Sequence, residues 1–244
     1  MGRVLAFLYG VVCYAIFFVT FLYAIGFVAN LVVPKAIDTG AAGPLVPTLL
    51  IDAALLGVFA IQHSVMARPA FKAWWTKFVP PAVERSTYVL LASAALVLVF
   101  WQWRPLPQVV WSVQGGAATA LLTISLMGFL IVLTSTFLIN HFDLFGLRQV
   151  HAYATGKEIP PHEFTTPLFY RVVRHPIYLG FIVAFWATPV MTVGHLVFAG
   201  ATTAYMLIAI QLEEHDLVGV FGDTYQAYRK RVSMILPWAP NTKA

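Results

Sequence analysis

Two segments in the last third of the chain carry side chains suited to binding a charged small molecule. In the first, RHPIYLG at residues 174–180, Pro176 fits the first turn of a helix and Gly180 lets another group approach the backbone. The free amides and the positive end of such a helix favour a carboxylate ligand, and Tyr178 adds an aromatic ring and a hydroxyl. The alternative is an ordinary helix start at the membrane interface, with Arg174 among the lipid headgroups.

The second segment begins about 35 residues later and combines EEHDL with FGDTYQAYR within residues 213–229. Helical spacing places Glu214, Tyr225 and Tyr228 along one side of a helix. It does not decide whether Glu213 or Glu214 would face a ligand. An amphipathic helix lying at the interface is the alternative to a binding segment.

Taken together, RHPxYxG, EExxL, FGxxYxxY and a terminal proline, Pro237, resemble the integral-membrane methyltransferases. These include isoprenylcysteine carboxyl methyltransferase and the bacterial phospholipid methyltransferases. The resemblance implies that about 171–237 binds S-adenosylmethionine between the last membrane hairpin and a C-terminal helix. The pocket residues that it implies are His175, Tyr178, Gly180, Glu214, Tyr225, Tyr228 and Arg229.

The chemistry of that cofactor agrees with these residue types. S-adenosylmethionine carries a sulfonium, an amino-acid head and an adenine, and methyl transfer leaves S-adenosylhomocysteine. Its binding therefore calls for aromatic faces, a carboxylate for the cationic groups, and amides or a cation for the ligand carboxylate.

A further segment, STFLINHFDLFGLRQ at residues 135–149, resembles the bacterial methanethiol S-methyltransferases, and parts of 62–68, 84–88 and 188–195 extend the likeness. The resemblance implies methylation of a small volatile thiol, methanethiol, to dimethyl sulfide. Other substrates of the same chemistry are another thiol, a lipid amine or an isoprenoid carboxylate. A second alternative is a non-enzymatic membrane accessory protein of a related denitrification-associated family.

Methylation of a thiol needs a group that favours the thiolate, because an alkyl thiol resembling cysteine, with a pKa of about 8.5, is mostly protonated at neutral pH. His141 with Asp143, or Tyr178 with Arg148, could supply it: the acid would orient the imidazole and the arginine would stabilise negative charge. For His141, the alternative is an interfacial histidine bonded to backbone.

No metal site is predicted. The single cysteine, Cys13, excludes a zinc site built on cysteines and also an intrachain disulfide. Methyl transfer from a sulfonium needs no Lewis acid, and the candidate histidines form neither HxxxH nor HExxH. These histidines are His141, His151, His162, His175 and His215.

The composition indicates how these residues are positioned. Of the 244 residues, 60% are hydrophobic and only 10% charged, and the mean hydropathy is +0.79, which excludes a soluble globule. The apolar stretches cover about 4–33, 45–66, 88–103, 116–140 and 176–212. The last is too long for one crossing and fits a hairpin joined near Pro189. We therefore predict an all-α, polytopic membrane bundle of five or six transmembrane segments, with a cytoplasmic C-terminal helix, forming one domain over 1–244.

The positive charges predict the orientation of this bundle. With the N-terminus inside, 13 of the 15 lysines and arginines fall on the cytoplasmic side, and only Lys35 and Arg104 fall outside. The net charge of +5 then reflects membrane topology, and no nucleic acid is expected as partner. We expect an integral protein of the bacterial inner membrane, with the active site and both termini cytoplasmic and no obligate protein partner. Asp52, inside the second span, is assigned no role.

Overall fold

The computed structural model describes residues 2–160 and 163–237. Their contacts divide the chain into two compact units. Unit 1 comprises Met1–Val109, Asn140–Pro161 and Thr192–His195, and unit 2 comprises Val110–Ile139, His162–Met191 and Leu196–Ala244. The single-domain interpretation stays a prediction.

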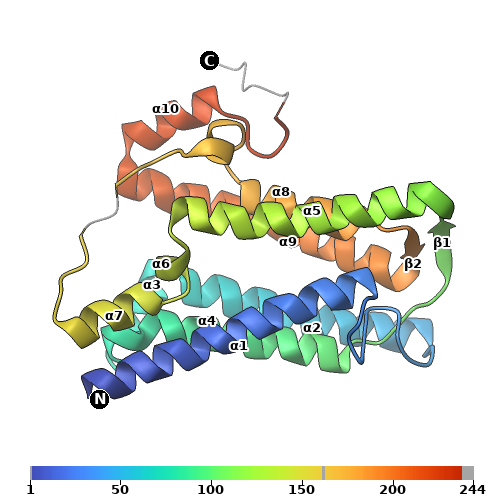
Figure 1. Ribbon diagram of the computed structural model, residues 1–244, viewed down its shortest axis with the longest axis horizontal. Helices are drawn as coiled ribbons and strands as arrows, with labels where there is room; N and C mark the ends of the chain where they lie inside the picture. The colour runs from blue at the N-terminus through green and yellow to red at the C-terminus, as the bar shows by residue number, and fades with distance from the viewer. Residues whose placement is uncertain (1, 161–162, 238–244) are drawn as a thin grey trace. The chain divides into compact units, whose positions relative to one another are not determined.

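Unit 1 is built on three long helices, α1 (Arg3–Ala29), α2 (Leu45–Ala67) and α4 (Pro81–Gln102). Both α1 and α2 pack against α4, and the three lie side by side in Figure 1. Three short helices complete the unit: α3 (Pro69–Trp75), α6 (His141–Leu144) and α7 (Leu147–Thr155).

A small apolar cluster fastens α7 to the long helices of unit 1. Ala6 of α1, Val83 of α4 and Val150 of α7 are buried against one another. Gly10 faces Val150 so closely that an added Cβ would lie 2.5 Å from a methyl carbon of that valine. The absence of a side chain at this position therefore allows α7 to lie against α1.

Unit 2 contains α5 (Gly115–Ile139), the 3₁₀ helix η1 (Leu168–Arg171), α8 (Pro176–Trp186), most of α9 (Val193–Phe221), and α10 (Asp223–Arg231). The hairpin predicted around Pro189 is confirmed, because α8 and α9 are antiparallel neighbours. The Phe185 and Phe198 rings lie 5.1 Å apart between centroids, and the Trp186 indole donates to Thr203. Strands β1 (Val109–Ser112) and β2 (Val190–Thr192) form a two-stranded sheet.

Small residues bring α5 and α8 into close contact. A Cβ added to Gly128 would lie 2.6 Å from the Ala184 nitrogen, and one added to Gly180 would lie 2.7 Å from the Gly128 carbonyl oxygen. The Ser125 hydroxyl donates to the Ala184 carbonyl over 2.7 Å. Close backbone approach through small residues is the usual basis of helix association in membranes.

The predicted fold class is confirmed, since five helices in the described part of the chain are long and apolar enough to cross a membrane: α1, α2, α4, α5 and α9. Helix α8 has 11 residues, which span about 16 Å and fall short of a bilayer core of about 30 Å. One boundary differs from expectation: α4 begins at Pro81, whereas the apolar stretch was placed from residue 88. The proline at the first helical position, rather than hydropathy, sets this start.

Candidate functional site

The centre of the site in unit 2 is the carboxylate of Glu214, near the end of α9. Arg174 Nε and His175 Nε2 lie 2.7 Å and 3.0 Å from Oε1 of this carboxylate. Arg229 Nε lies 3.0 Å from Oε2. Only 3% of the Glu214 side chain is exposed, so one buried carboxylate is shared by two arginines and a histidine.

The backbone after α10 returns to the start of α8 and holds Arg174 and His175 in place. Val173 and Ser233 form an isolated parallel β-bridge. The amides of Arg174 and His175 donate to the carbonyls of Ser233 and Met234 over 2.8 Å and 3.2 Å. His175 is then the N-cap residue of α8 and Pro176 takes the first helical position, as predicted.

The neighbouring Glu213 has a different environment. Its Oε2 accepts a hydrogen bond of 3.0 Å from the Tyr178 hydroxyl and lies 3.9 Å from His175 Nδ1, while 44% of its side chain is exposed. Sequence spacing left the choice between the two glutamates open. The structure distinguishes them: Glu214 is buried against two arginines and a histidine, and Glu213 is partly open to solvent.

Tyr225 and Tyr228 of α10 are buried in an aromatic cluster with Phe164. The Phe164 ring lies 5.7 Å and 5.3 Å from the two tyrosine rings. The Tyr228 hydroxyl donates to the Tyr170 carbonyl over 2.5 Å. Burial raises the pKa of Tyr228 to about 12 and also raises the pKa of Tyr225, so both phenols keep their protons. These two tyrosines hold α10 in position.

Gly180 and Arg174 have surroundings in the structure that the sequence did not show. Gly180 does permit a close approach, but α5 makes it, through Gly128 and Val132. Arg174, for which a place among the headgroups was one alternative, is buried on Glu214. The RHP motif contained that arginine, but its partner lies 40 residues away and gives no local signal.

The remaining candidates belong to unit 1. His141 Nε2 lies 2.8 Å from the Tyr14 hydroxyl, and burial lowers the pKa of this histidine, which favours the neutral imidazole. The Asp143 carboxylate accepts from Gln149 Nε2 over 3.1 Å and lies 4.0 Å from Arg148 Nη1. Sequence reasoning missed Tyr14, because 127 residues separate it from His141.

Over residues 2–160 and 163–237, no three His, Cys, Asp or Glu side chains are grouped to hold a metal ion. His162, one of the histidines considered for such a role, lies outside the described residues.

Comparison with known proteins places this chain in a family. The sequence profile described as "NnrU protein" matches residues 50–236. Methanethiol S-methyltransferase 1 of Bradyrhizobium diazoefficiens is 59% identical over 237 residues, which cover 97% of this chain and 83% of that protein. The chain belongs to the NnrU protein family and to the methanethiol S-methyltransferase family.

Other relatives of this NnrU-family chain show how far the similarity extends. Methanethiol S-methyltransferase of Mycobacterium tuberculosis is 56% identical over 239 residues, which cover 98% of both chains. Nurim of Sus scrofa is 29% identical over 183 residues, covering 71% of this chain and 69% of nurim. No solved structure matches. The NnrU match includes both the Glu214 cluster and the His141 segment.

Proposed function

We propose that this NnrU-family protein is an S-adenosylmethionine-dependent methyltransferase that converts methanethiol to dimethyl sulfide in the membrane. The proposal rests on near-full-length similarity, at 46–59% identity, to several proteins named methanethiol S-methyltransferase. The Glu214 cluster supports it by supplying a charged site whose composition suits the cofactor.

The residue types at the site suit the charged groups of S-adenosylmethionine. Arg174 and Arg229 share the carboxylate of Glu214, and the partly exposed guanidinium of Arg229 can also bind the carboxylate of a ligand. Glu213 offers a partly exposed carboxylate for a cationic group, and Tyr178 beside it offers an aromatic face. When bound, S-adenosylmethionine supplies a sulfonium-linked methyl group that a thiol sulfur displaces, leaving S-adenosylhomocysteine.

We assign the binding roles as follows. Arg229, with 42% of its side chain exposed, contacts the ligand carboxylate, while buried Glu214 and His175 fix the position of the arginines. Tyr225 and Tyr228 keep α10, and therefore Arg229, over the site. Gly180 contributes by allowing α8 to pack on α5.

For activation of the thiol we propose two candidate groups, one in each unit. His141 is kept neutral by burial and can accept a proton, with Asp143 and Arg148 as the nearby charged pair of unit 1. Tyr178, hydrogen-bonded to Glu213, is the candidate of unit 2. His141→Gln and Tyr178→Phe, each with cofactor binding measured separately, decide between them. Lost turnover with intact binding identifies the group, and unchanged turnover removes it from the mechanism.

We also propose that the protein lies in the bacterial inner membrane with both termini and the active site in the cytoplasm. The support is the distribution of positive charge, with 13 of 15 lysines and arginines on one side. Fusing a reporter that is active only in the cytoplasm to the C-terminus tests this orientation. An inactive reporter on an inserted, intact protein would overturn it.

Headspace detection of dimethyl sulfide tests the reaction. Purified protein is given S-adenosylmethionine with methanethiol, and parallel samples receive a lipid amine or an isoprenoid carboxylate in its place. Dimethyl sulfide is the expected product. Cofactor binding without dimethyl sulfide would discard methanethiol as substrate, and failure to bind the cofactor would favour the accessory-protein alternative.

A further inference from the structure

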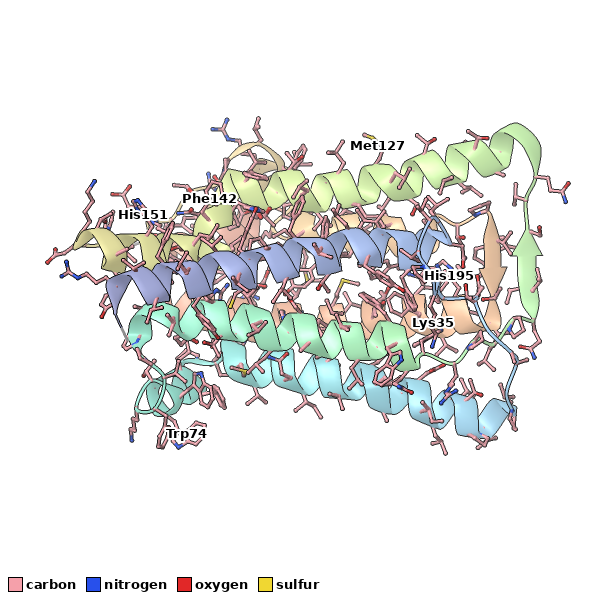
Figure 2. All side chains as sticks on the ribbon, turned by 60° about the horizontal axis from the view of Figure 1, so that its bottom comes forward. Lys35, Trp74, Met127, Phe142, His151 and His195 are labelled. Carbon is pink, nitrogen blue, oxygen red and sulfur yellow. The ribbon has the colours of Figure 1, made fainter. Side chains whose placement is uncertain are left out.

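The segment from Arg68 to Pro80, which includes α3, joins two membrane-spanning helices of unit 1. It follows α2, which ends at Ala67, and precedes α4, which begins at Pro81. Both neighbours are long and apolar enough to cross a membrane, so the segment lies where they leave the bilayer. Figure 2 shows Trp74 at the end of unit 1 opposite to Lys35 and His195.

Exposed aromatic side chains mark this segment. Trp74 is 50% exposed and Phe78 is 69% exposed, and their rings lie 5.5 Å apart between centroids. Phe71 and Trp75 lie behind Trp74, with ring centroids 5.4 Å and 6.0 Å from it. An exposed tryptophan at the end of α3 and an exposed phenylalanine in the turn after it are suited to the boundary between headgroups and acyl chains.

The charges of the segment have one sign. Arg68, Lys72 and Lys77 are basic, and residues 68–80 contain no aspartate or glutamate. Within the described part of the chain, neither lysine forms an ion pair. Burial and the neighbouring Arg85 lower the pKa of Lys72, an effect that Glu84 and Asp143 oppose more weakly. An added anion would relieve this repulsion between cations.

We propose that residues 68–80 form an anchor that binds the headgroups of anionic phospholipids. The lysines supply the attraction for the lipid phosphate, and the projecting rings fix the depth of the segment in the interface. The occupant is a lipid rather than a soluble anion, because the exposed rings of Trp74 and Phe78 lie in the same short segment as exposed Lys77 and partly exposed Lys72. Binding of the lipid by residues 68–80 does not depend on methyl transfer. The test therefore measures lipid binding and not enzyme activity.

The test is a titration of the detergent-purified full chain with short-chain phosphatidylglycerol, followed by native mass spectrometry or thermal shift. Lys72→Gln combined with Lys77→Gln should weaken binding by about 25-fold, since each interfacial cation contributes about fivefold. Replacing both lysines by arginine should restore it. The matched control is Lys230→Gln with Arg231→Gln, which removes two exposed charges from α10 and should leave affinity within about twofold.

Three results would overturn the proposal. One is wild-type affinity in the Lys72→Gln, Lys77→Gln protein. Another is an equal loss in the α10 control, which would indicate attraction by net charge alone. The third is competition by inorganic phosphate at the concentration of the lipid, because a site for free phosphate would not need the aromatic rings.

Discussion

The two units bury polar groups in different ways. In unit 1, neutral side chains form separate pairs between helices, such as Tyr14 with His141 at 2.8 Å and Tyr9 with Thr87 at 3.0 Å. In unit 2, two arginines and a histidine surround Glu214. Buried charges are costly unless they are paired, and here Arg174 and Arg229 share the buried carboxylate of Glu214, while Glu213 lies 3.9 Å from His175 Nδ1. The pairs of unit 1 join helices through neutral groups, whereas the cluster of unit 2 is held by charged ones.

The largest loss of stability is expected for Glu214→Gln. Removing the carboxylate leaves Arg174 and Arg229 without their shared ion-pair partner, so the free energy of unfolding should fall by about 3–5 kcal/mol. Thermal unfolding in detergent measures the loss. The matched control is Glu213→Gln, whose carboxylate is partly exposed and should cost far less stability. Equal losses in the two variants would contradict the distinction between the glutamates.

The next largest effect is expected at the α5–α8 contact. Gly128→Val places a side chain against the backbone of α8 and should destabilise unit 2 by about 1–3 kcal/mol or more. Gly200→Ala in α9, where an added Cβ meets nothing within 4 Å, should be neutral or slightly stabilising. Both are compared by thermal unfolding. A tolerated valine at position 128 would show that the helices separate without cost.

Asp52 of unit 1 is a fully buried carboxylate that also bears on this comparison. Asp52 accepts a hydrogen bond of 2.9 Å from the Arg104 amide, which fastens α2 to the end of α4. Asp52→Ala should lower the free energy of unfolding by about 1–3 kcal/mol, because that amide loses its acceptor. Asp52→Asn keeps the acceptor and should stay near wild type. A large loss in the asparagine variant would mean that unit 1 also depends on a buried charge.

The smallest effect concerns pH. Burial lowers the pKa of folded His141 below its unfolded value of about 6.5, so the unfolded chain binds the proton more readily. Stability contributed by the neutral imidazole is therefore complete above that value and declines as the pH falls through it. His141→Gln should remove this part of the acid sensitivity, and His151→Gln, at an exposed position, should retain it. Unfolding temperatures across pH 5–8, about the range of histidine titration, make the comparison.

Features that depend on neighbouring residues were predictable from the sequence. Pro176 at the start of α8 and the turn at Pro189 follow from the geometry of proline, and the long spans follow from apolar length. The full extent of α4 was not predicted, because the helix begins at Pro81, before the apolar stretch that starts at about residue 88. Hydropathy detects the lipid-facing part of a helix and not its full extent.

Features that depend on distant partners were beyond sequence reasoning. The interfacial alternative for Arg174 fitted its sequence neighbours equally well, and only the fold brings that arginine to Glu214. The pairing of Tyr14 with His141 likewise joins separate segments. Gly180 could be assigned a close approach from its residue type, but the sequence did not show that α5 makes that approach.

Titration calorimetry of S-adenosylmethionine into detergent-purified protein tests the central proposal, that the charged cluster of unit 2 is the cofactor site. The wild type should bind, and Arg229→Gln should weaken binding by about 10- to 100-fold, the expected effect of losing a charged hydrogen bond. Lys230→Gln, the adjacent exposed position, should bind as the wild type does. Unchanged affinity in Arg229→Gln, or no binding by the wild type, would contradict the assignment.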